Sequence, residues 1–212
     1  MSIALLLGPT GLVGSHLLHQ LVDAPEYTRV IALSRRPLDL KHEKLTVVIS
    51  ELKDVERHRD ELQANDIFCC LGTTIKAAQT KDAFRAVDHD APLAVARLQE
   101  DRLHKIFIVV SGLGAAPDSM FFYSRVKAEM EQDLAGLDFR HVFAVRPSLL
   151  LGQRRQLRPG EILGEIGALP FIPLMRGSWR RYRPIQAGTV ADNMLRIARG
   201  QSVREGMEWA KL

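Results

Sequence analysis

Short apolar runs alternate along the chain with longer segments in which apolar residues recur every three or four positions. The apolar runs are Ile3–Leu7, Arg29–Leu33, Leu45–Ile49, Ile67–Leu71, Ile106–Val110 and Phe139–Val145. Runs of this length without polar alternation are typical of parallel strands that are buried on both faces. The segments with helical character between them are Leu12–Val22, Asp54–Gln63, Asp82–Arg102 (interrupted near Pro92) and Phe121–Leu134. We therefore predict a doubly wound α/β fold of the Rossmann type, a parallel sheet with helices on both faces.

The alternation of strand-like and helix-like segments stops after Pro147. Residues 149–185 are rich in Gly, Pro and Arg, and a helical pattern returns only at Val190–Ala198, before a last short strand at Met207–Trp209. The irregular stretch is too short to bury a core of its own. We expect one NAD(P)-binding domain over residues 1–212, in which 149–185 form a small cap on the substrate side. Such a cap covers the carboxyl ends of the strands, where open α/β sheets bind ligands.

The composition excludes several classes of protein. The 212 residues are 46% hydrophobic and 25% charged, which rules out a disordered tail, a collagen-like fibre and a disulfide-stapled miniprotein. Cys69 and Cys70 are adjacent, so they cannot cross-link distant elements, and side chains at adjacent strand positions point to opposite faces. Both are interpreted as packing residues rather than redox or metal groups. Two unpaired thiols indicate a reduced compartment, and we predict a cytoplasmic protein.

The distribution of charge and hydropathy does not favour a membrane, a nucleic acid or a metal as a partner. Residues Met1–Val22 carry no Asp, Glu, Lys or Arg, but they lack a basic leader, and a membrane span would bury the Gly8–Gly11 turn. We expect no membrane association. Trp179–Arg183 mixes aromatic and basic residues as nucleic-acid surfaces do, although a cap that faces an anionic ligand explains it equally well. We expect no nucleic acid. The seven histidines show no metal-binding spacing, so no metal is predicted.

A glycine-rich turn joins the first strand to the first helix. Gly8-Pro9-Thr10-Gly11-Leu12-Val13-Gly14 has the pattern G-x-x-G-x-x-G. Glycine permits the tight turn and lets the backbone approach a pyrophosphate, which then lies at the helix N-terminus. A glycine turn after a strand also has a purely structural use. Its position between strand and helix favours dinucleotide binding.

The second strand ends in Ser34-Arg35-Arg36. An acidic residue is expected near this point for NAD, whereas arginine accommodates the 2′-phosphate of NADP. The alternative is a solvated basic turn, because arginine is commonly exposed. The pattern favours NADP over NAD.

Three polar residues suggest acid–base chemistry. Tyr123 and Lys127 lie one helical turn apart, and a nearby cation favours the phenolate form of a tyrosine. Ser111 follows the fifth strand, where its hydroxyl could polarise a substrate carbonyl. A Y-x-x-x-K spacing also occurs by chance, and serine is a common turn residue at strand ends. The three residues together favour a catalytic site.

These motifs resemble those of atypical or extended short-chain dehydrogenases/reductases, in particular the oxidoreductase group of the HIV Tat-interacting protein and its bacterial relatives. The residues that carry the resemblance are Gly8–Gly14, Ser34-Arg35-Arg36, Phe68-Cys69-Cys70-Leu71-Gly72-Thr73-Thr74, Val87-Asp88, Val109-Val110-Ser111, Tyr123-Ser-Arg-Val-Lys127 with Glu129, Arg146-Pro147 and Arg158-Pro-Gly-Glu161. The likeness runs almost from end to end. Cys-Cys-Leu-Gly-Thr-Thr and Arg-Pro-Gly-Glu are specific to that group.

The resemblance implies a Rossmann fold that binds NADPH. The implied cofactor-binding residues are Gly8, Thr10, Gly11, Leu12, Val13, Gly14, Ser34, Arg35, Arg36, Glu51, Leu52, Leu71, Gly72, Thr73, Lys127, Arg146, Pro147 and Ser148. Lys127 is implied to hold the nicotinamide ribose and Tyr123 to act as acid or base. Two departures stand out. Ser50-Glu51-Leu52 matches the family's adenine-side pair only with a one-residue shift, and Ser111-Gly112 replaces a pair of serines.

Two functions follow. The first is an NADPH-dependent oxidoreductase that acts on a small carbonyl or alcohol substrate. The second is an NADPH-binding redox-sensing or regulatory protein without turnover, which would engage a protein partner. The Tyr123/Lys127 pair favours the enzyme, and the missing second serine favours the regulator.

Overall fold

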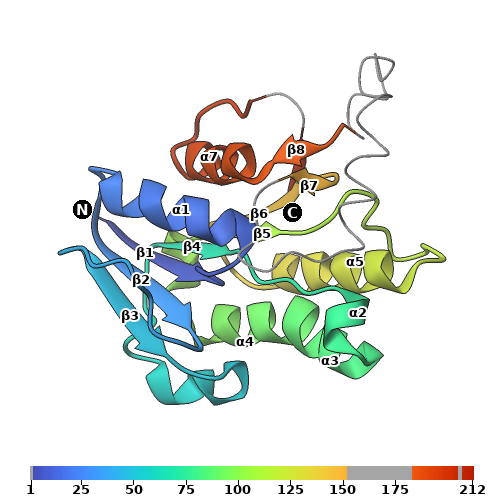
Figure 1. The fold of residues 1–212 in the computed structure, drawn as a ribbon, viewed down its shortest axis with the longest axis horizontal. Helices are drawn as coiled ribbons and strands as arrows, with labels where there is room; N and C mark the ends of the chain where they lie inside the picture. The colour runs from blue at the N-terminus through green and yellow to red at the C-terminus, as the bar shows by residue number, and fades with distance from the viewer. Residues whose placement is uncertain (1, 152–182, 205–206) are drawn as a thin grey trace.

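The computed structural model describes residues 2–151, 183–204 and 207–212. A seven-stranded sheet in the order β3-β2-β1-β4-β5-β6-β9 forms its centre (Figure 1). The strands are β1 (Ser2–Leu7), β2 (Tyr27–Ser34), β3 (Leu45–Ile49), β4 (Asp66–Cys69), β5 (Ile106–Val110), β6 (His141–Arg146) and β9 (Glu208–Lys211). The first six are parallel, and β9 runs antiparallel to β6. The predicted α/β fold is confirmed.

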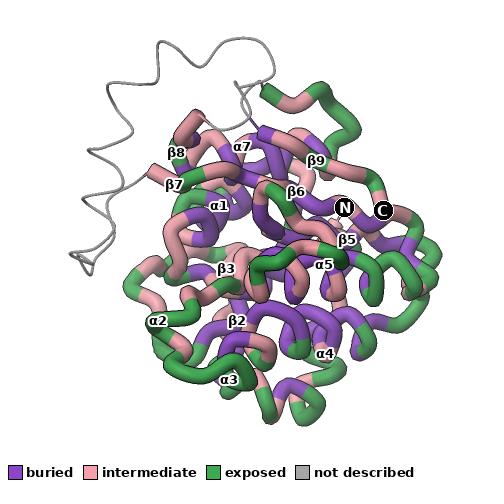
Figure 2. The backbone as a smooth tube through the Cα atoms, turned by 90° about the vertical axis from the view of Figure 1, so that its right-hand side faces the viewer, coloured by how far each residue is buried: buried purple, intermediate pink, exposed green. Residues whose placement is uncertain are grey.

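Helices cover both faces of the sheet. Helices α1 (Leu12–Asp23) and α7 (Ala187–Ala198) lie together on one face, and α4 (Ala91–Leu98) and α5 (Phe122–Ala135) lie on the other (Figure 1). Each layer has its own apolar core, because consecutive strand residues point to opposite faces. In β1, Ala4 and Leu6 contribute to the core under α1 and α7, whereas Leu5 and Leu7 contribute to the core over α4 and α5. The buried segments run through the middle of the molecule (Figure 2).

The two cysteines follow the same alternation. The Cys69 side chain belongs to the α4/α5 core, and Cys70 packs against the α1/α7 core, where its Sγ lies 3.8 Å from Met194 Sδ. Burial raises the pKa of both thiols, that of Cys69 to about 12. The structure therefore agrees with their interpretation as packing residues.

The strand order places one edge of the sheet for ligand binding. The chain turns outward from β1 to β3 and then returns to β4 on the other side of β1. At this reversal, the segments that follow the carboxyl ends of β1 and β4 diverge, which is where open parallel sheets bind ligands. The glycine turn and the Leu71–Thr73 segment both lie there.

Two helical predictions need correction, and one helix was missed. Asp54–Gln63 is a 3₁₀-helix over Leu52–His58. The predicted helix Asp82–Arg102 consists of α3 (Lys81–Arg85), a π-helical segment η2 (Ala86–Asp90) and α4, and it ends at Leu98. Pro92 explains the π segment, since proline has no N–H to donate to a carbonyl and the preceding Ala91 N–H bonds to Ala86 O, five residues back. The short helix α2 (Ile75–Ala78) was not predicted.

Most of the predicted cap lies outside the described residues. Of 149–185, the structure shows only the ends, where β7 (Leu150–Leu151) pairs in parallel with β8 (Ile185–Gln186). The cap, the single domain and the basic segment Trp179–Arg183 therefore stay predictions.

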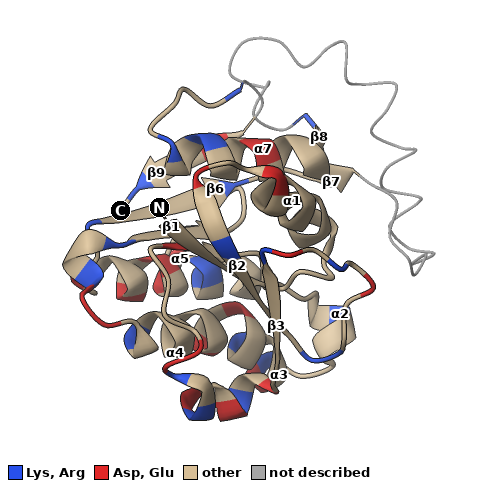
Figure 3. Ribbon diagram, turned by 90° about the vertical axis from the view of Figure 1, so that its left-hand side faces the viewer, with Lys and Arg blue, Asp and Glu red and all other residues tan. Residues whose placement is uncertain are grey.

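Charges of both signs are interspersed over α3, α4 and α5 in Figure 3. Among the described residues, no helix combines the length and apolar character needed to cross a bilayer. In the same part of the chain, no cluster of three or more His, Cys, Asp or Glu side chains is arranged to hold a metal ion.

Candidate functional site

The glycine turn is built by close backbone contacts. Gly8 has a φ of +76°, a conformation that favours glycine, and a Cβ there would lie 2.9 Å from Cys70 O. A Cβ on Gly14 would lie 2.1 Å from Gly8 O, so Gly14 lets α1 pack against the turn. Gly11 is less crowded, because its Cβ would stand 3.3 Å from Gly8 O. Gly8 and Gly14 are thus required by the backbone of the turn itself, whereas Gly11 is the least constrained of the three.

The N-terminus of α1 is open to an anion. Gly11 is its N-cap residue, without a side-chain cap, and the described first turn contains no acidic residue. The first N–H groups of an α-helix have no partner within the helix, and the helix dipole favours negative charge there. The turn therefore offers what a phosphate group needs, with Thr10 exposed beside it and Leu12 and Val13 in the first turn.

The basic turn after β2 presents two exposed cations. Arg35 and Arg36 are exposed, and within the described part of the chain neither guanidinium has a hydrogen bond or an ion pair. Ser34 is buried, and its Oγ accepts the Arg36 N–H at 3.3 Å, which fixes the start of the turn. Glu51 and Leu52 lie at the same edge, because Ser50 N donates to Ser34 O at 3.0 Å.

Tyr123 and Lys127 come together on α5 with an aspartate that lies on η2. The Lys127 Nζ lies 2.8 Å from Asp88 Oδ1 and donates to Val110 O at 3.3 Å. Only 3% of the Lys127 side chain and 1% of the Asp88 side chain are exposed. The other Asp88 oxygen, Oδ2, accepts the Thr73 N–H at 2.8 Å. One carboxylate thus connects the predicted cofactor segment Leu71–Thr73 with the predicted catalytic lysine.

The electrostatics of Tyr123 differ from the sequence prediction. Burial raises the pKa of the phenol above its usual value of 10; Lys127 opposes the rise and Asp88 adds to it. Burial alone lowers the pKa of Lys127, but Asp88 and then Tyr123 more than reverse this, so the net pKa is raised. Lys127 thus lowers the pKa of the phenol as predicted, but burial, the largest cause, and Asp88 together outweigh it, so the net shift is away from phenolate. Tyr123 stays a protonated phenol beside an ammonium group.

Ser111 and Gly112, the two residues after β5, have different surroundings. Ser111 is buried, and its Oγ has no hydrogen-bond partner among the described residues. The following Gly112 is in close contact with Tyr123, because a Cβ on Gly112 would stand 2.6 Å from the phenol oxygen. The glycine, not the predicted serine, is thus in contact with the Tyr123 hydroxyl.

A hollow of about 590 Å³ opens beside the phenol. The described residues that line it are Gly112, Leu113, Gly114, Tyr123, Pro147, Ser148, Leu149 and Glu208. Pro147 and Ser148, which were predicted to approach the nicotinamide end of the cofactor, thus line the same hollow as Tyr123. Arg146 does not line the hollow: its guanidinium is paired with Glu131 of α5, with Nε 3.0 Å from Oε1. Arg146 thus holds β6 against the helix that carries Tyr123.

Sequence reasoning gave no role to two residues of this site. Asp88 entered only as part of a resemblance, and its signal was a carboxylate in a helical segment that otherwise buries apolar residues such as Phe84 and Leu93. Glu208 reaches the hollow from the C-terminal strand, and no motif marked it. The predicted site residues themselves lie along one edge of the sheet, and their functional roles stay predictions.

Curated relatives match most of the chain. Protein HTATIP2 of Rattus norvegicus is 34% identical over 194 residues, covering 90% of this chain and 78% of that protein. Protein FMP52, mitochondrial, of Saccharomyces cerevisiae is 32% identical over 180 residues, covering 84% and 78%. The chain belongs to the HTATIP2-like group of extended short-chain dehydrogenases/reductases. No protein-family model matches it.

Solved structures show the fold of this HTATIP2-like protein. MoeE5 in complex with UDP-glucuronic acid and NAD has a TM-score of 0.70 at 17% identity, over 95% of this chain and 73% of that one. The Bordetella bronchiseptica enzyme WbmH in complex with NAD⁺ has a TM-score of 0.69 at 14% identity, over 94% and 73%. At these identities the likeness establishes the Rossmann-like fold.

The prediction of a cytoplasmic location is wrong in light of the relatives. The FMP52 proteins of Saccharomyces cerevisiae, Emericella nidulans and Aspergillus clavatus are named mitochondrial. The prediction rested on the unpaired Cys69 and Cys70. Their packing in the two cores accounts for both thiols without reference to a compartment.

Proposed function

We propose that this protein is an NADPH-dependent oxidoreductase that acts on a small carbonyl or alcohol substrate. The observation that carries the proposal is the Tyr123 phenol at a hollow, with the buried Lys127 ammonium one helical turn away. A proton donor and a fixed cation beside a cavity are what reduction of a carbonyl requires of the protein.

The described residues fit a nicotinamide dinucleotide. The open N-terminus of α1 suits its pyrophosphate, and Arg35 and Arg36 suit a 2′-phosphate, because planar guanidinium groups bind phosphate through paired hydrogen bonds. Relatives in fold, MoeE5 and WbmH, were solved with NAD. When bound, the nicotinamide exchanges a hydride with the substrate carbon.

The protein's own part is the proton and the alignment of the substrate. Tyr123 donates the phenol proton to the substrate oxygen in reduction and takes it back in oxidation. Lys127 stabilises the phenolate that reduction leaves behind, because an opposite charge nearby favours the ionised form. Pro147 and Ser148 border the hollow and confine the substrate beside the phenol.

A second function rests on the environment of Ser111 and Gly112. Since the Ser111 hydroxyl is buried without a partner and Gly112 has no side chain, the described loop offers no hydroxyl beside Tyr123 to polarise a carbonyl. An NADPH-binding redox-sensing protein that signals to a protein partner needs no such group. This alternative predicts cofactor binding without turnover.

Steady-state NADPH oxidation against a panel of small aldehydes and ketones separates the two functions. With a substrate found, Tyr123→Phe is expected to lower turnover by about 10²–10⁴-fold, the usual size of acid–base assistance, and to leave NADPH affinity unchanged. Lys127→Ala is expected to weaken both. Tyr27→Phe is the control, because the Tyr27 hydroxyl bonds to Asp66 Oδ2 and lies away from the hollow. Tight NADPH binding with no turnover across the panel would instead establish the regulator.

A further inference from the structure

Asp88 is a buried carboxylate with two different duties. Its Oδ1 pairs with the Lys127 ammonium at 2.8 Å, and its Oδ2 accepts the Thr73 N–H at 2.8 Å. Gly72 lies on the same side, where a Cβ would make an ordinary contact with Oδ1 at 3.6 Å. Only 1% of the Asp88 side chain is exposed, so water has no access to take its place in either contact. A buried ion pair of this kind is costly to break, since the remaining charge is left without a partner.

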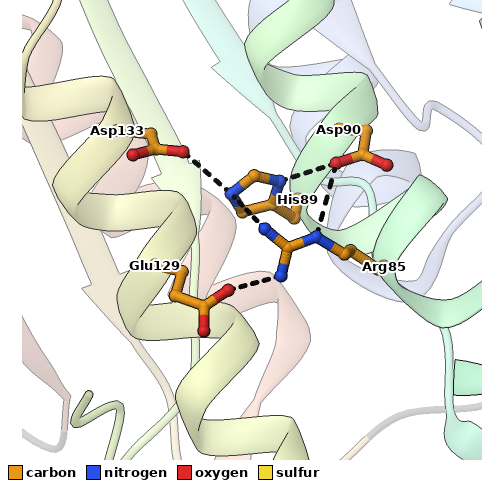
Figure 4. Close-up of polar contacts among 5 residues, drawn as sticks. All are labelled: Arg85, His89, Asp90, Glu129 and Asp133. Atoms are coloured by element: carbon orange, nitrogen blue, oxygen red, sulfur yellow. Dashed lines mark hydrogen bonds and ion pairs between the residues drawn. The ribbon is translucent and has the colours of Figure 1, made fainter. Parts of the chain in front are cut away.

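The segment that carries Asp88 is fastened to α5 a second time, on its outer side. His89, the next residue, lies between two carboxylates: its Nδ1 is 2.7 Å from Asp90 Oδ1 and its Nε2 is 3.0 Å from Asp133 Oδ2 (Figure 4). Arg85 reaches across to Glu129 and lies 3.4 Å from the His89 ring. Two layers of polar contacts therefore join η2 to the helix of Tyr123 and Lys127. The π-helical geometry places consecutive side chains, Asp88 and His89, against the same helix.

The charge around the phenol follows from these contacts. The ionisable groups that act on Tyr123 are Lys127 from α5 and Asp88 from η2, and the Cys69 thiol of β4 acts on Lys127. Phe84 of α3 packs against the phenol ring with the centroids 5.7 Å apart and contributes no charge. Asp88 is thus the carboxylate in direct contact with the Lys127 ammonium, and Glu208 of β9 is a second carboxylate at the hollow that Tyr123 lines.

We propose that Asp88 is a positioning residue, which holds Lys127 under the phenol and offsets its charge so that Tyr123 remains a proton donor until the cofactor and substrate are bound. The role rests on the proposed oxidoreductase function, but the effect of Asp88 on the Tyr123 pKa can be measured without cofactor or substrate. Asp88→Asn keeps the size of the side chain and an oxygen for the Thr73 N–H, and it removes only the charge. With the Lys127 charge unopposed, the Tyr123 pKa is expected to fall.

Spectrophotometric titration of tyrosinate tests this without substrate or cofactor. The chain has three tyrosines, so each titration is paired with the same protein carrying Tyr123→Phe, and the difference is assigned to Tyr123. In Asp88→Asn the Tyr123 midpoint is expected to fall by about one pH unit or more. Lys127→Met is expected to raise the Tyr123 midpoint above that of the wild type. The double variant Asp88→Asn with Lys127→Met is expected to have a higher Tyr123 midpoint than Asp88→Asn alone. Asp133→Asn, which alters a carboxylate of α5 that contacts His89, is the matched control and should leave the Tyr123 midpoint unchanged.

An unchanged or raised midpoint in a folded Asp88→Asn protein overturns the proposal, and so does an equal fall in Asp133→Asn. Thermal melting establishes that each variant is folded. If Asp88→Asn does not fold, the test uses Lys127→Met, which removes the positive charge of the same ion pair. An unchanged Tyr123 midpoint in Lys127→Met then overturns the proposal. Where turnover is measurable, reduction requires the protonated phenol, so its rate in Asp88→Asn should decline at a lower pH than in the wild type. If the protein shows no turnover, the proposed function is wrong, but the Tyr123 midpoint can still be measured and the role of Asp88 still tested.

Discussion

The Tyr123 phenol occupies the space that a side chain on Gly112 would need. A Cβ at Gly112 would stand 2.6 Å from the phenol oxygen and 2.8 Å from the ring carbon Cε1. The ring cannot withdraw freely, because Phe84 packs against it. The glycine at this position therefore determines how deeply the proposed proton donor is seated.

Gly112→Ala is expected to displace the phenol and to lower turnover by about 100-fold, as small misplacements of a catalytic group commonly do. NADPH affinity should change little, because the glycine turn and the basic turn lie elsewhere. Gly136→Ala, at the end of the same helix, is the control, since its Cβ would make only ordinary contacts at 3.5 Å or more. Equal turnover in wild type and Gly112→Ala would show that the position of Tyr123 does not limit the reaction.

The cofactor preference is tested by removing both guanidinium groups of the basic turn. Arg35→Ala with Arg36→Ala is expected to weaken NADPH binding by about tenfold to 100-fold, because hydrogen bonds between charged groups contribute about 1.5–3 kcal/mol. NADH affinity should stay the same, since NADH lacks the 2′-phosphate. Titration calorimetry with both cofactors measures the ratio, and Arg140→Ala, an exposed arginine just before the amino-terminal end of β6, is the control. A ratio that the double variant leaves unaltered contradicts NADP selectivity.

The central sheet was predictable because most of its parallel strands are apolar runs. Leu45–Ile49 and Ile106–Val110 were predicted to the residue, and β1 within one residue, since runs of this kind have no stable place except between two layers of helices. The interrupted helix was not predictable in detail. Periodicity shows that residues near Pro92 are helical, but whether the helix kinks, stops or widens depends on where the carbonyl of Asp88 finds space.

The candidate site was predicted as a set of motifs but not as an electrostatic arrangement. Tyr123 and Lys127 are close in sequence, so their helical spacing could be read directly. The counter-charge on Asp88 comes from a distant segment, and only the packing of η2 on α5 brings it within 2.8 Å of Lys127. The sign of the effect on Tyr123 therefore required the structure.

A pH dependence of stability follows from Asp66, which accepts the Tyr27 hydroxyl at 2.7 Å. Burial raises the pKa of Asp66 above its ordinary value of 3.8. The folded protein then holds the proton more tightly than the unfolded chain, so this group's contribution to stability falls as the pH rises from 3.8 through the raised value. Asp66→Asn keeps an acceptor for Tyr27 and should remove that fall, so the variant is expected to be more stable than the wild type at neutral pH.

Urea unfolding at a series of pH values measures the Asp66 effect. Asp138→Asn, which alters an exposed carboxylate, is the control and should leave the curve of stability against pH unchanged. If Asp66→Asn lowers stability at neutral pH, the carboxylate is stabilising as a charged partner of Tyr27, and the argument from burial is wrong.

The last prediction separates the structural glycines of the first turn from Gly11, the one proposed to face the cofactor. Gly14→Ala places a Cβ 2.1 Å from Gly8 O, a backbone atom that cannot move without opening the turn. Its free energy of unfolding should fall by about 1–3 kcal/mol or more, as overpacking in a tight region does. Gly11→Val meets the backbone less closely, with the Cβ 3.3 Å from Gly8 O, so most of the fold's stability should survive. Its branched side chain crowds the open N-terminus of α1, and NADPH binding should be lost. Thermal melting and calorimetric titration on the two variants give opposite patterns if this assignment is correct. A folded Gly11→Val protein that binds NADPH normally would place the cofactor somewhere other than this turn.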